Sequence, residues 1–262
     1  PGVSTRRATQ RGQKPATMTI THLLLDIEGT TCPVSFVSEV LFPYAKQSLC
    51  SYLNNHQEDP DLKNILQAAE REWDGDPSPD SINLLQATRN QKLNFIDSIK
   101  VYLEHLINVD RKSTTLKDLQ GKIWDNGYRK GEITSHLFNE TTECLKRWHS
   151  RKLSLSVYSS GSIQAQKLLY RHTNDGDLEH LFDYWFDTHT GNKKESDSYR
   201  RIVNEINTNP SNLLFISDNA DECDAAGASG MKTLFSLREG NPDQNPRSHR
   251  VIKTLNDVDE YL

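Results

Sequence analysis

Short apolar runs, each bounded by turn residues, recur along the chain and predict buried β-strands. Helical patterns separate the later runs, at 163–171, 198–207 and 222–228. Strands that alternate with helices are typical of βαβ units, which form a parallel sheet with right-handed crossovers. The pattern therefore predicts a Rossmann-like, three-layer α/β/α core. The predicted strands are 21–25, 153–158, 184–186, 213–217 and 233–236, with a weaker one at 250–253.

The interval between the first two predicted strands is too long for an ordinary crossover, which needs only about a dozen residues plus its helix. It contains helical patterns and no convincing strand, and the breaker-rich stretch DGDPSPD at 74–80 divides it. We therefore expect an all-helical cap domain at 34–134, inserted into a catalytic core formed by 18–33 and 135–262. The helical segments are 34–53, 62–73, 82–106 and 116–127.

Composition and charge narrow the class of protein. The formal net charge is −5, which favours neither nucleic acid nor an anionic membrane surface as a partner. No apolar run reaches the roughly 18 residues that a transmembrane helix needs. The four cysteines are scattered and form no CxxC pair, a usage that suits the reducing cytosol. We expect a cytoplasmic protein.

Residues 1–17 differ from the rest of the chain. They include four basic residues and no acidic one, and almost none of them is apolar. A transit peptide shares this composition, but the segment lacks the amphipathic pattern of one. We interpret 1–17 as a disordered leader or an added segment in front of Met18.

Polar side chains follow four of the predicted strands at the point where each strand ends. The carboxyl ends of parallel strands meet at one edge of a sheet, where ligands of open α/β folds bind. Taken singly, each residue is better explained as a turn residue, a helix cap or a solvated side chain. Their recurrence at successive strand ends favours a functional site. In chain order they are Asp26 and Glu28, Ser159 and Ser160, Lys193, and Asp218 and Glu222.

This set of side chains suits phosphoryl transfer. A carboxylate can attack phosphorus to form an aspartyl-phosphate, and Mg²⁺ prefers the oxygen ligands that carboxylates and phosphate provide. Hydroxyl groups and the N-terminus of the helix after "SSGS" can hold phosphate oxygens, and a lysine adds positive charge. A second carboxyl group, such as that of Glu28, can protonate the leaving oxygen and then activate water.

The ordered set resembles the motifs of the haloacid dehalogenase superfamily of aspartate-nucleophile phosphatases. Longer blocks are similar to the acireductone synthases, or enolase-phosphatases, of methionine salvage. Glu28 is characteristic of that family, because the wider superfamily usually has Asp at this position. The similarity extends from Met18 to the C-terminus. Its blocks are DIEGTTCPVSFVSEVLFPYA, IWDNGYRKGEI, YSSGSIQAQKLLY, GDLEHLFDYWFDTHTGNKKESDSY and LLFISDNADE.

The resemblance implies a reaction and a substrate. The phosphorylated diketone 2,3-diketo-5-methylthiopentyl-1-phosphate is enolised and then dephosphorylated to the acireductone 1,2-dihydroxy-3-keto-5-methylthiopentene. By motif position, Ser159 and Ser160 bind the phosphate or the substrate, and Lys193 binds on the phosphate side. The family implies a monomer with this small molecule as its partner.

The resemblance also implies one Mg²⁺ per subunit. Asp26 would be both the nucleophile and a metal ligand. Glu28 would offer its backbone carbonyl to the metal and its side chain as the acid/base group, and Asp218 would complete the metal site. Glu222 would support metal-bound water from outside the ligand set.

Three other readings stay open at this point. The protein could be a general phosphatase of the same superfamily without enolase activity. It could be a phosphoacceptor signalling domain, although such domains lack a long helical insertion. It could also be an inactive relative that only binds, which the presence of Asp26, Lys193 and Asp218 argues against.

Overall fold

The computed structural model describes residues 19–262, so the predicted leader at 1–17 lies outside the described residues. Within the described part of the chain, no helix is long and apolar enough to cross a membrane.

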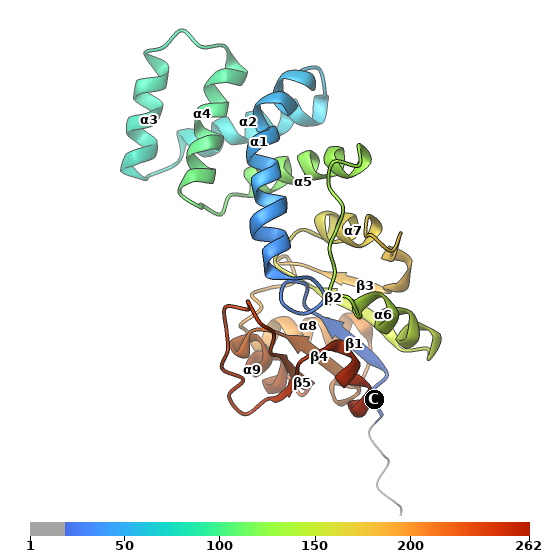
Figure 1. The fold of residues 1–262 in the computed structure, drawn as a ribbon. Helices are drawn as coiled ribbons and strands as arrows, with labels where there is room; N and C mark the ends of the chain where they lie inside the picture. Colours follow the sequence, from blue (N-terminus) through green and yellow to red (C-terminus); the bar gives the residue numbers. More distant parts are fainter. Residues whose placement is uncertain (1–18) are drawn as a thin grey trace, which may run out of the picture.

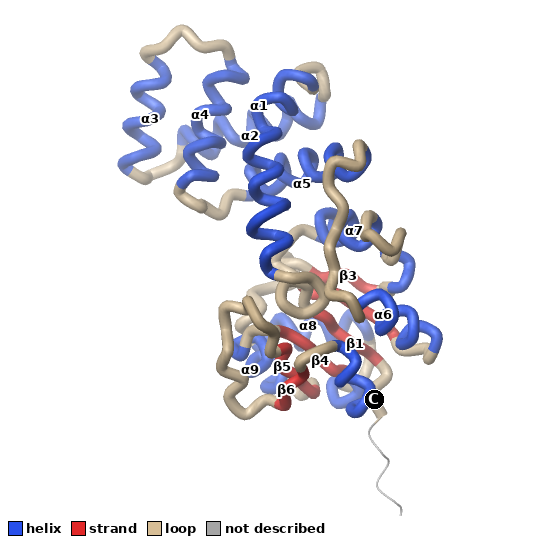
Figure 2. Tube along the Cα trace, viewed as in Figure 1, coloured by secondary structure: helices blue, strands red, loops and turns tan. Residues whose placement is uncertain are grey.

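A six-stranded sheet forms the centre of the larger lobe (Figures 1 and 2). Its strand order is β3-β2-β1-β4-β5-β6 and all neighbouring pairs are parallel, as the sequence predicts. From β1, the chain adds β2 and β3 on one side of that strand and then β4, β5 and β6 on its other side. The strand order therefore reverses at β1. The strands are β1 His22–Leu25, β2 Ser154–Tyr158, β3 Tyr184–Phe186, β4 Leu213–Ser217, β5 Lys232–Ser236 and β6 Arg250–Ile252.

Helices cover both faces of the sheet, because successive side chains of a strand point to opposite faces. In β1, Leu23 and Leu25 pack into one buried cluster with residues of α6 and α7, and Leu24 packs into another with residues of α8 and α9. This arrangement confirms the three-layer α/β/α core. The flanking helices are α6 Thr141–Ser150, α7 Ile163–Arg171, α8 Ser196–Ile206 and α9 Ala220–Ala228.

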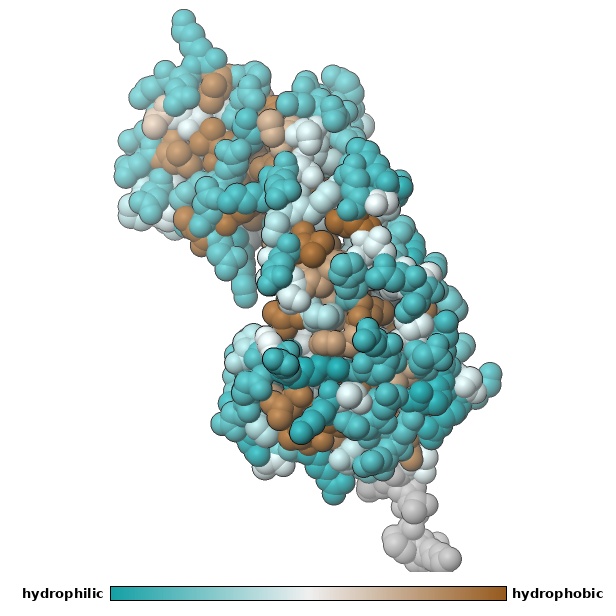
Figure 3. Space-filling model, viewed as in Figure 1, coloured by the Kyte–Doolittle hydropathy of each residue, from teal (hydrophilic) through white to brown (hydrophobic). Residues whose placement is uncertain are grey.

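The segment between β1 and β2 is helical, as predicted, and its helices as far as α5 form a second lobe, whereas α6 packs on the sheet (Figures 1 and 3). The helix predicted at 82–106 is in fact two helices, because the polar stretch at 90–94 ends one and Asn94 caps the next through Asp97 N. The helical lobe begins with a short π-helix, Phe36–Leu41, which leads directly into α1. The other helices are α1 Phe42–Asn55, α2 Pro60–Asp74, α3 Pro79–Arg89, α4 Phe95–Asn108 and α5 Thr114–Arg129.

The helical lobe has a hydrophobic core of its own, to which α1, α2, α4 and α5 contribute. Tyr44 and Trp124 pack against both this core and that of the sheet lobe, so they mark the junction. The Trp124 indole donates a hydrogen bond to Leu41 O at 2.8 Å. The Tyr44 ring lies directly against Gly127 of α5. The junction is therefore tightly packed around the start of α1.

Two glycines of α5 should respond oppositely to alanine. A Cβ at Gly127 would lie 2.6 Å from the Tyr44 ring, whereas a Cβ at Gly121 meets nothing within 4 Å. Gly121→Ala should stabilise the protein by about 0.5–1 kcal/mol through helix propensity. Gly127→Ala should destabilise it by about 1–3 kcal/mol through overpacking. Urea unfolding of both variants measures the difference, and equal effects would contradict the packing at this junction.

Candidate active site

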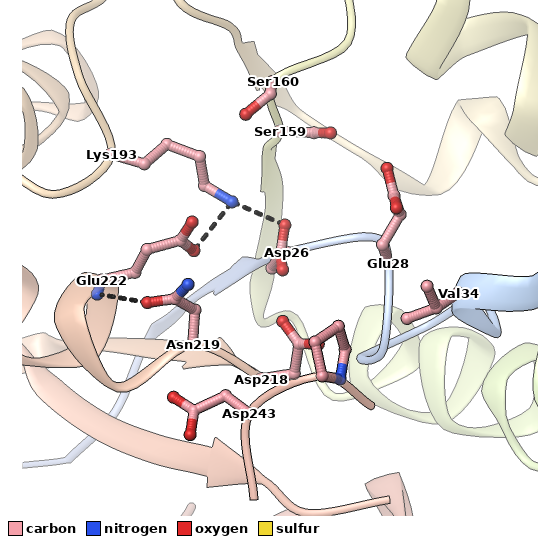
Figure 4. Close-up of a pocket in the computed structure, with 11 residues that line it drawn as sticks. Asp26, Glu28, Val34, Ser159, Ser160, Lys193, Asp218, Asn219, Glu222 and Asp243 are labelled. Atoms are coloured by element: carbon pink, nitrogen blue, oxygen red, sulfur yellow. Dashed lines mark hydrogen bonds and ion pairs between the residues drawn. The ribbon is translucent and has the colours of Figure 1, made fainter. Parts of the chain in front are cut away.

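All seven side chains singled out in the sequence line one pocket, of about 220 Å³ (Figure 4). It lies where strands β1, β2 and β4 end. In Figure 4, Ser159 and Ser160 lie on one side of Asp26, and Asp218 lies on the opposite side. The order of strands explains this gathering, because β1 is paired with both β2 and β4. The remaining lining residues, which the sequence did not indicate, are Val34, Asn219, Pro242 and Asp243.

Lys193 is a buried cation between two carboxylates. Its Nζ lies 2.7 Å from Asp26 Oδ1 and 2.8 Å from Glu222 Oε2, and its side chain is only 7% exposed. Burial alone would lower the pKa of Lys193, but the carboxylates of Asp26 and Glu222 outweigh it and raise that pKa. The ammonium group therefore stays charged and holds Asp26 in place.

The loop that carries Lys193 is held by two tyrosines. Tyr199 donates its hydroxyl hydrogen to Lys193 O at 2.6 Å, and Tyr158 donates to Gly191 O at 2.8 Å. Both tyrosines are fully buried and meet edge to face. These contacts explain how a residue well beyond the end of β3 reaches the pocket.

The turn after Asp26 depends on Gly29. Its φ of 72° is in the left-handed region that favours glycine, and a Cβ there would overlap Asp218 Oδ2. Gly29 O accepts hydrogen bonds from Ser236 Oγ at 2.8 Å and Asn241 Nδ2 at 3.0 Å. Ser236 and Asn241 were not predicted, and nothing local in their sequence indicates this contact. They hold the turn against the side of the pocket where Asp218 lies.

Several carboxyl groups lie close together around Asp218, so negative charge is unfavourable there. Burial, together with the nearby carboxylates of Asp26 and Glu222, raises the pKa of Asp218 to about 8. Burial, followed by the charge of Asp26, raises the pKa of Glu28 to about 7. Among the described residues, none makes a hydrogen bond or ion pair with the Asp218 carboxylate. The site thus contains an unpaired, largely buried carboxyl group that a cation would stabilise.

The oxygen atoms fit a hard divalent cation. Across residues 19–262, no group of three or more His, Cys, Asp and Glu side chains could hold a metal ion. A metal held by fewer carboxylates needs backbone, water or substrate oxygens as well. Mg²⁺ normally binds through one or two carboxylates, waters and substrate phosphate. The carboxylates of Asp26 and Asp218, together with backbone oxygen atoms of the turn after Asp26, are therefore suitable donors for Mg²⁺.

The loop after β2 differs from the expectation in one respect. Helix α7 begins at Ile163, as predicted, but the Ile163 amide donates to Asp187 Oδ2 at 3.3 Å. That helix amide is thus already occupied by a protein carboxylate. The amides of Ser160 and Ser162 form no hydrogen bond with any described residue. These two loop amides, with the hydroxyls of the loop, remain for an anionic ligand.

Glu222 occupies the first turn of α9 and is positioned by the cap of that helix. Asn219 accepts hydrogen bonds from the amides of Asp221 and Glu222, at 3.0 and 3.2 Å. Asp243 accepts one from the Ala220 amide at 3.0 Å. An Asn before acidic residues is a recognisable N-cap signal, so Asn219 could have been identified from the sequence. Asp243 lies on a distant loop, and no local signal marks it.

Lys193 should be essential to stability, and its neighbour should not. Lys193→Met leaves Asp26 and Glu222 buried without their cation and should cost about 3–5 kcal/mol of unfolding free energy. Lys194→Met removes an ion pair in which Lys194 is 55% exposed and should leave stability close to wild type. Urea unfolding in the presence of a chelator checks both. Similar stabilities for the two variants would contradict the buried charge cluster.

Gly29→Ala should abolish activity, because the new methyl group displaces Asp218. We expect phosphate release to fall at least about 100-fold. Gly176→Ala is the control, since Gly176 also has a left-handed φ, 95°, but a Cβ there meets nothing within 4 Å. Backbone strain should cost both variants a comparable amount of stability, and Gly29→Ala should lose more because its Cβ also overlaps Asp218. An active Gly29→Ala enzyme would show that the turn does not require close contact with Asp218.

Comparisons with known proteins agree with this geometry. The profile of the haloacid dehalogenase-like hydrolases matches residues 20–230. Enolase-phosphatase E1 of Parasynechococcus marenigrum (strain WH8102) is 88% identical over 94% of this chain and 100% of its own length. Its counterpart in Aquifex aeolicus is 39% identical over 83% of this chain and 90% of its own length.

Solved structures agree as well. UTR4 protein from Saccharomyces cerevisiae is 33% identical, with a TM-score of 0.67 over 90% of this chain and 98% of its own. CbbY from Rhodobacter sphaeroides, solved with phosphate, is 15% identical over 92% of this chain and 96% of its own, has a TM-score of 0.55, and supports the fold alone. This chain therefore belongs to the haloacid dehalogenase-like hydrolases and, within them, to the enolase-phosphatase E1 family.

Proposed function

We propose that this protein is an Mg²⁺-dependent enolase-phosphatase of methionine salvage. Its substrate is 2,3-diketo-5-methylthiopentyl-1-phosphate, and its products are the acireductone 1,2-dihydroxy-3-keto-5-methylthiopentene and phosphate. High identity over the full length of an enolase-phosphatase supports the activity. The observation that carries the proposal is the meeting of Asp26, Lys193 and the Ser159–Ser160 loop in one pocket.

Phosphoryl transfer would begin at Asp26. One carboxylate oxygen attacks phosphorus, the bond from phosphorus to the leaving oxygen breaks, and Glu28 donates a proton to that oxygen. Glu28 then takes a proton from water, which attacks phosphorus and releases phosphate from Asp26. Lys193, charged and 2.7 Å from Asp26 Oδ1, would orient the nucleophile and attract the phosphate. Ser159 and Ser160 would hold the phosphate oxygens.

Mg²⁺ would be held by the carboxylates of Asp26 and Asp218 and by the Glu28 backbone carbonyl. When bound, it neutralises phosphate charge and polarises the substrate carbonyl for enolisation. Glu222 would act from outside the ligand set, because its carboxylate already contacts Lys193 and Ser217. Metal binding would also remove the unfavourable crowding of carboxylates around Asp218.

Enolisation needs a base next to the substrate carbonyl, and we propose Glu28. Lys193 holds Asp26 and Glu222, and backbone amides hold Asp243. With Asp218 assigned to the metal, Glu28 is the carboxyl group left among the described residues that line the pocket. The same group would then act in both steps.

The helical lobe would act as a cap that excludes water and recognises the methylthio tail. We propose boundaries of 34–134 for it, and of 18–33 with 135–262 for the catalytic core. We also propose a cytoplasmic monomer whose partner is the small phosphorylated diketone. The scattered cysteines support the cytoplasmic setting, and the net charge of −5 favours a small molecule over nucleic acid as the partner.

The proposal is tested with the diketone phosphate itself. Enol formation is followed by absorbance, and released phosphate is counted in the same sample. Asp26→Asn should lower phosphate release by roughly a thousandfold or more, because the nucleophile is lost. Asp221→Asn, at the exposed start of α9, should behave as wild type. A wild-type enzyme that hydrolyses simple phosphate esters and ignores the diketone would instead be a general phosphatase.

Chelation of Mg²⁺ should stop both steps, and adding Mg²⁺ back should restore them. Both steps place negative charge on substrate oxygen atoms, and Lys193, which is already paired with Asp26 and Glu222, does not neutralise that charge alone. Full enol formation in excess chelator would contradict a shared metal site.

A further inference from the structure

Gln166 is a buried amide in the first turns of α7, behind the loop that ends β2. Its side chain is 2% exposed. Its Nε2 lies 2.8 Å from Gly161 O, 2.8 Å from Phe186 O and 3.4 Å from Ser159 O. One side-chain amide therefore connects the loop after β2 to the end of β3.

These contacts determine which way the peptide groups of the loop face. Residues 19–262 contain no cis peptide bond, and in a trans peptide the carbonyl and the next N–H point in opposite directions. Because Ser159 O and Gly161 O face Gln166, the amides of Ser160 and Ser162 face away from it. Those two amides form no hydrogen bond with any described residue. The carbonyl between these two, Ser160 O, accepts a hydrogen bond from Lys117 of α5 at 3.0 Å.

Packing alone does not explain a glutamine at this position. Gln166 Oε1 is buried without a hydrogen-bond partner among the described residues. An unpaired buried carbonyl lowers stability, and a methionine of similar shape would avoid that cost. The carbonyls on the other side explain the choice, because Ser159 O and Gly161 O accept a hydrogen bond from no other described residue, whereas Phe186 O also accepts one from the Ser159 amide. The Gln166 side chain thus fixes the conformation of the loop through its Nε2, while its Oε1 stays without a hydrogen bond among the described residues.

We propose that Gln166 is a positioning residue for the substrate phosphate. It does not touch the substrate. It holds the loop carbonyls back so that the amides of Ser160 and Ser162 can face the phosphate, alongside the hydroxyls of Ser159 and Ser160. This inference rests on the proposed function, because it takes the bound anion to be the substrate's phosphate group.

The test compares Gln166→Met with wild type in steady-state kinetics and in calorimetric titration with inorganic phosphate and Mg²⁺. Phosphate oxygens are held in both the ground state and the transition state, so their loss raises KM and leaves kcat largely unchanged. We expect KM and the phosphate Kd to rise about tenfold, as is typical when a supporting hydrogen bond to a binding group is lost. We expect kcat to stay within about twofold of wild type.

Two controls separate positioning from structure. Gln164→Met makes the same substitution on the exposed side of α7 and should match wild type in every measurement. Leu168→Ala removes a core side chain of the same helix, so it should lower the melting temperature without changing KM. Gln166→Met with wild-type KM and phosphate Kd, or with only the stability loss of Leu168→Ala, would overturn the inference.

The phosphate titration also distinguishes this inference from the proposed function. If wild type binds phosphate but does not turn over the diketone, the proposed function fails and the ratio of phosphate Kd values still decides the role of Gln166. If wild type turns over the diketone and Gln166→Met matches it, the function stands and the inference fails. If wild type binds no phosphate, the inference is overturned.

Discussion

The structure depends on one buried cation, Lys193, placed among carboxylates. Isolated charges are expensive to bury, so such a cluster persists only where the charges are paired. Lys193 pairs with Asp26 and Glu222, and Glu28 and Asp218 are left without an ion pair among the described residues. The raised pKa values of Glu28 and Asp218, about 7 and 8, express this excess of negative charge. The proposed metal cation would offset this excess when the anionic phosphate binds, so metal and substrate would complete the same charge balance.

The topology of the sheet brings the charges to one place. With β1 between β2 and β4, the ends of three strands adjoin although their residues are far apart in the chain. Individual contacts then position the side chains of the site. Gly29 allows Asp218 to lie close to the turn, Tyr199 holds the loop that carries Lys193, and Gln166 holds the loop after β2. The helical lobe contacts this edge of the sheet in two ways: by the packed junction around the start of α1, and by the hydrogen bond from Lys117 to Ser160 O. A change in the position of the helical lobe would therefore directly displace the loop proposed to bind phosphate.

Much of this arrangement was predictable from the sequence, because it follows from local patterns. The apolar runs identified all six strands, and the polar residues after them identified the pocket. The break at 90–94 was missed, because helical periodicity alone does not distinguish one long helix from two. Helix α6 was not predicted either. Asn241, Asp243 and Gln166 were also missed, because their roles arise from contacts across loops that are remote in sequence. Such contacts depend on the tertiary structure and leave no pattern of spacing.

The central claim is that Asp26 accepts the phosphoryl group. The most direct measurement is a single turnover with the diketone phosphate and Mg²⁺, quenched in acid and reduced with borohydride, followed by peptide mass mapping. Borohydride converts an acyl phosphate to an alcohol, so the account predicts homoserine at position 26, and none in enzyme treated without substrate. Phosphate release without any modified Asp26, or with the modification on another carboxyl group, would contradict it.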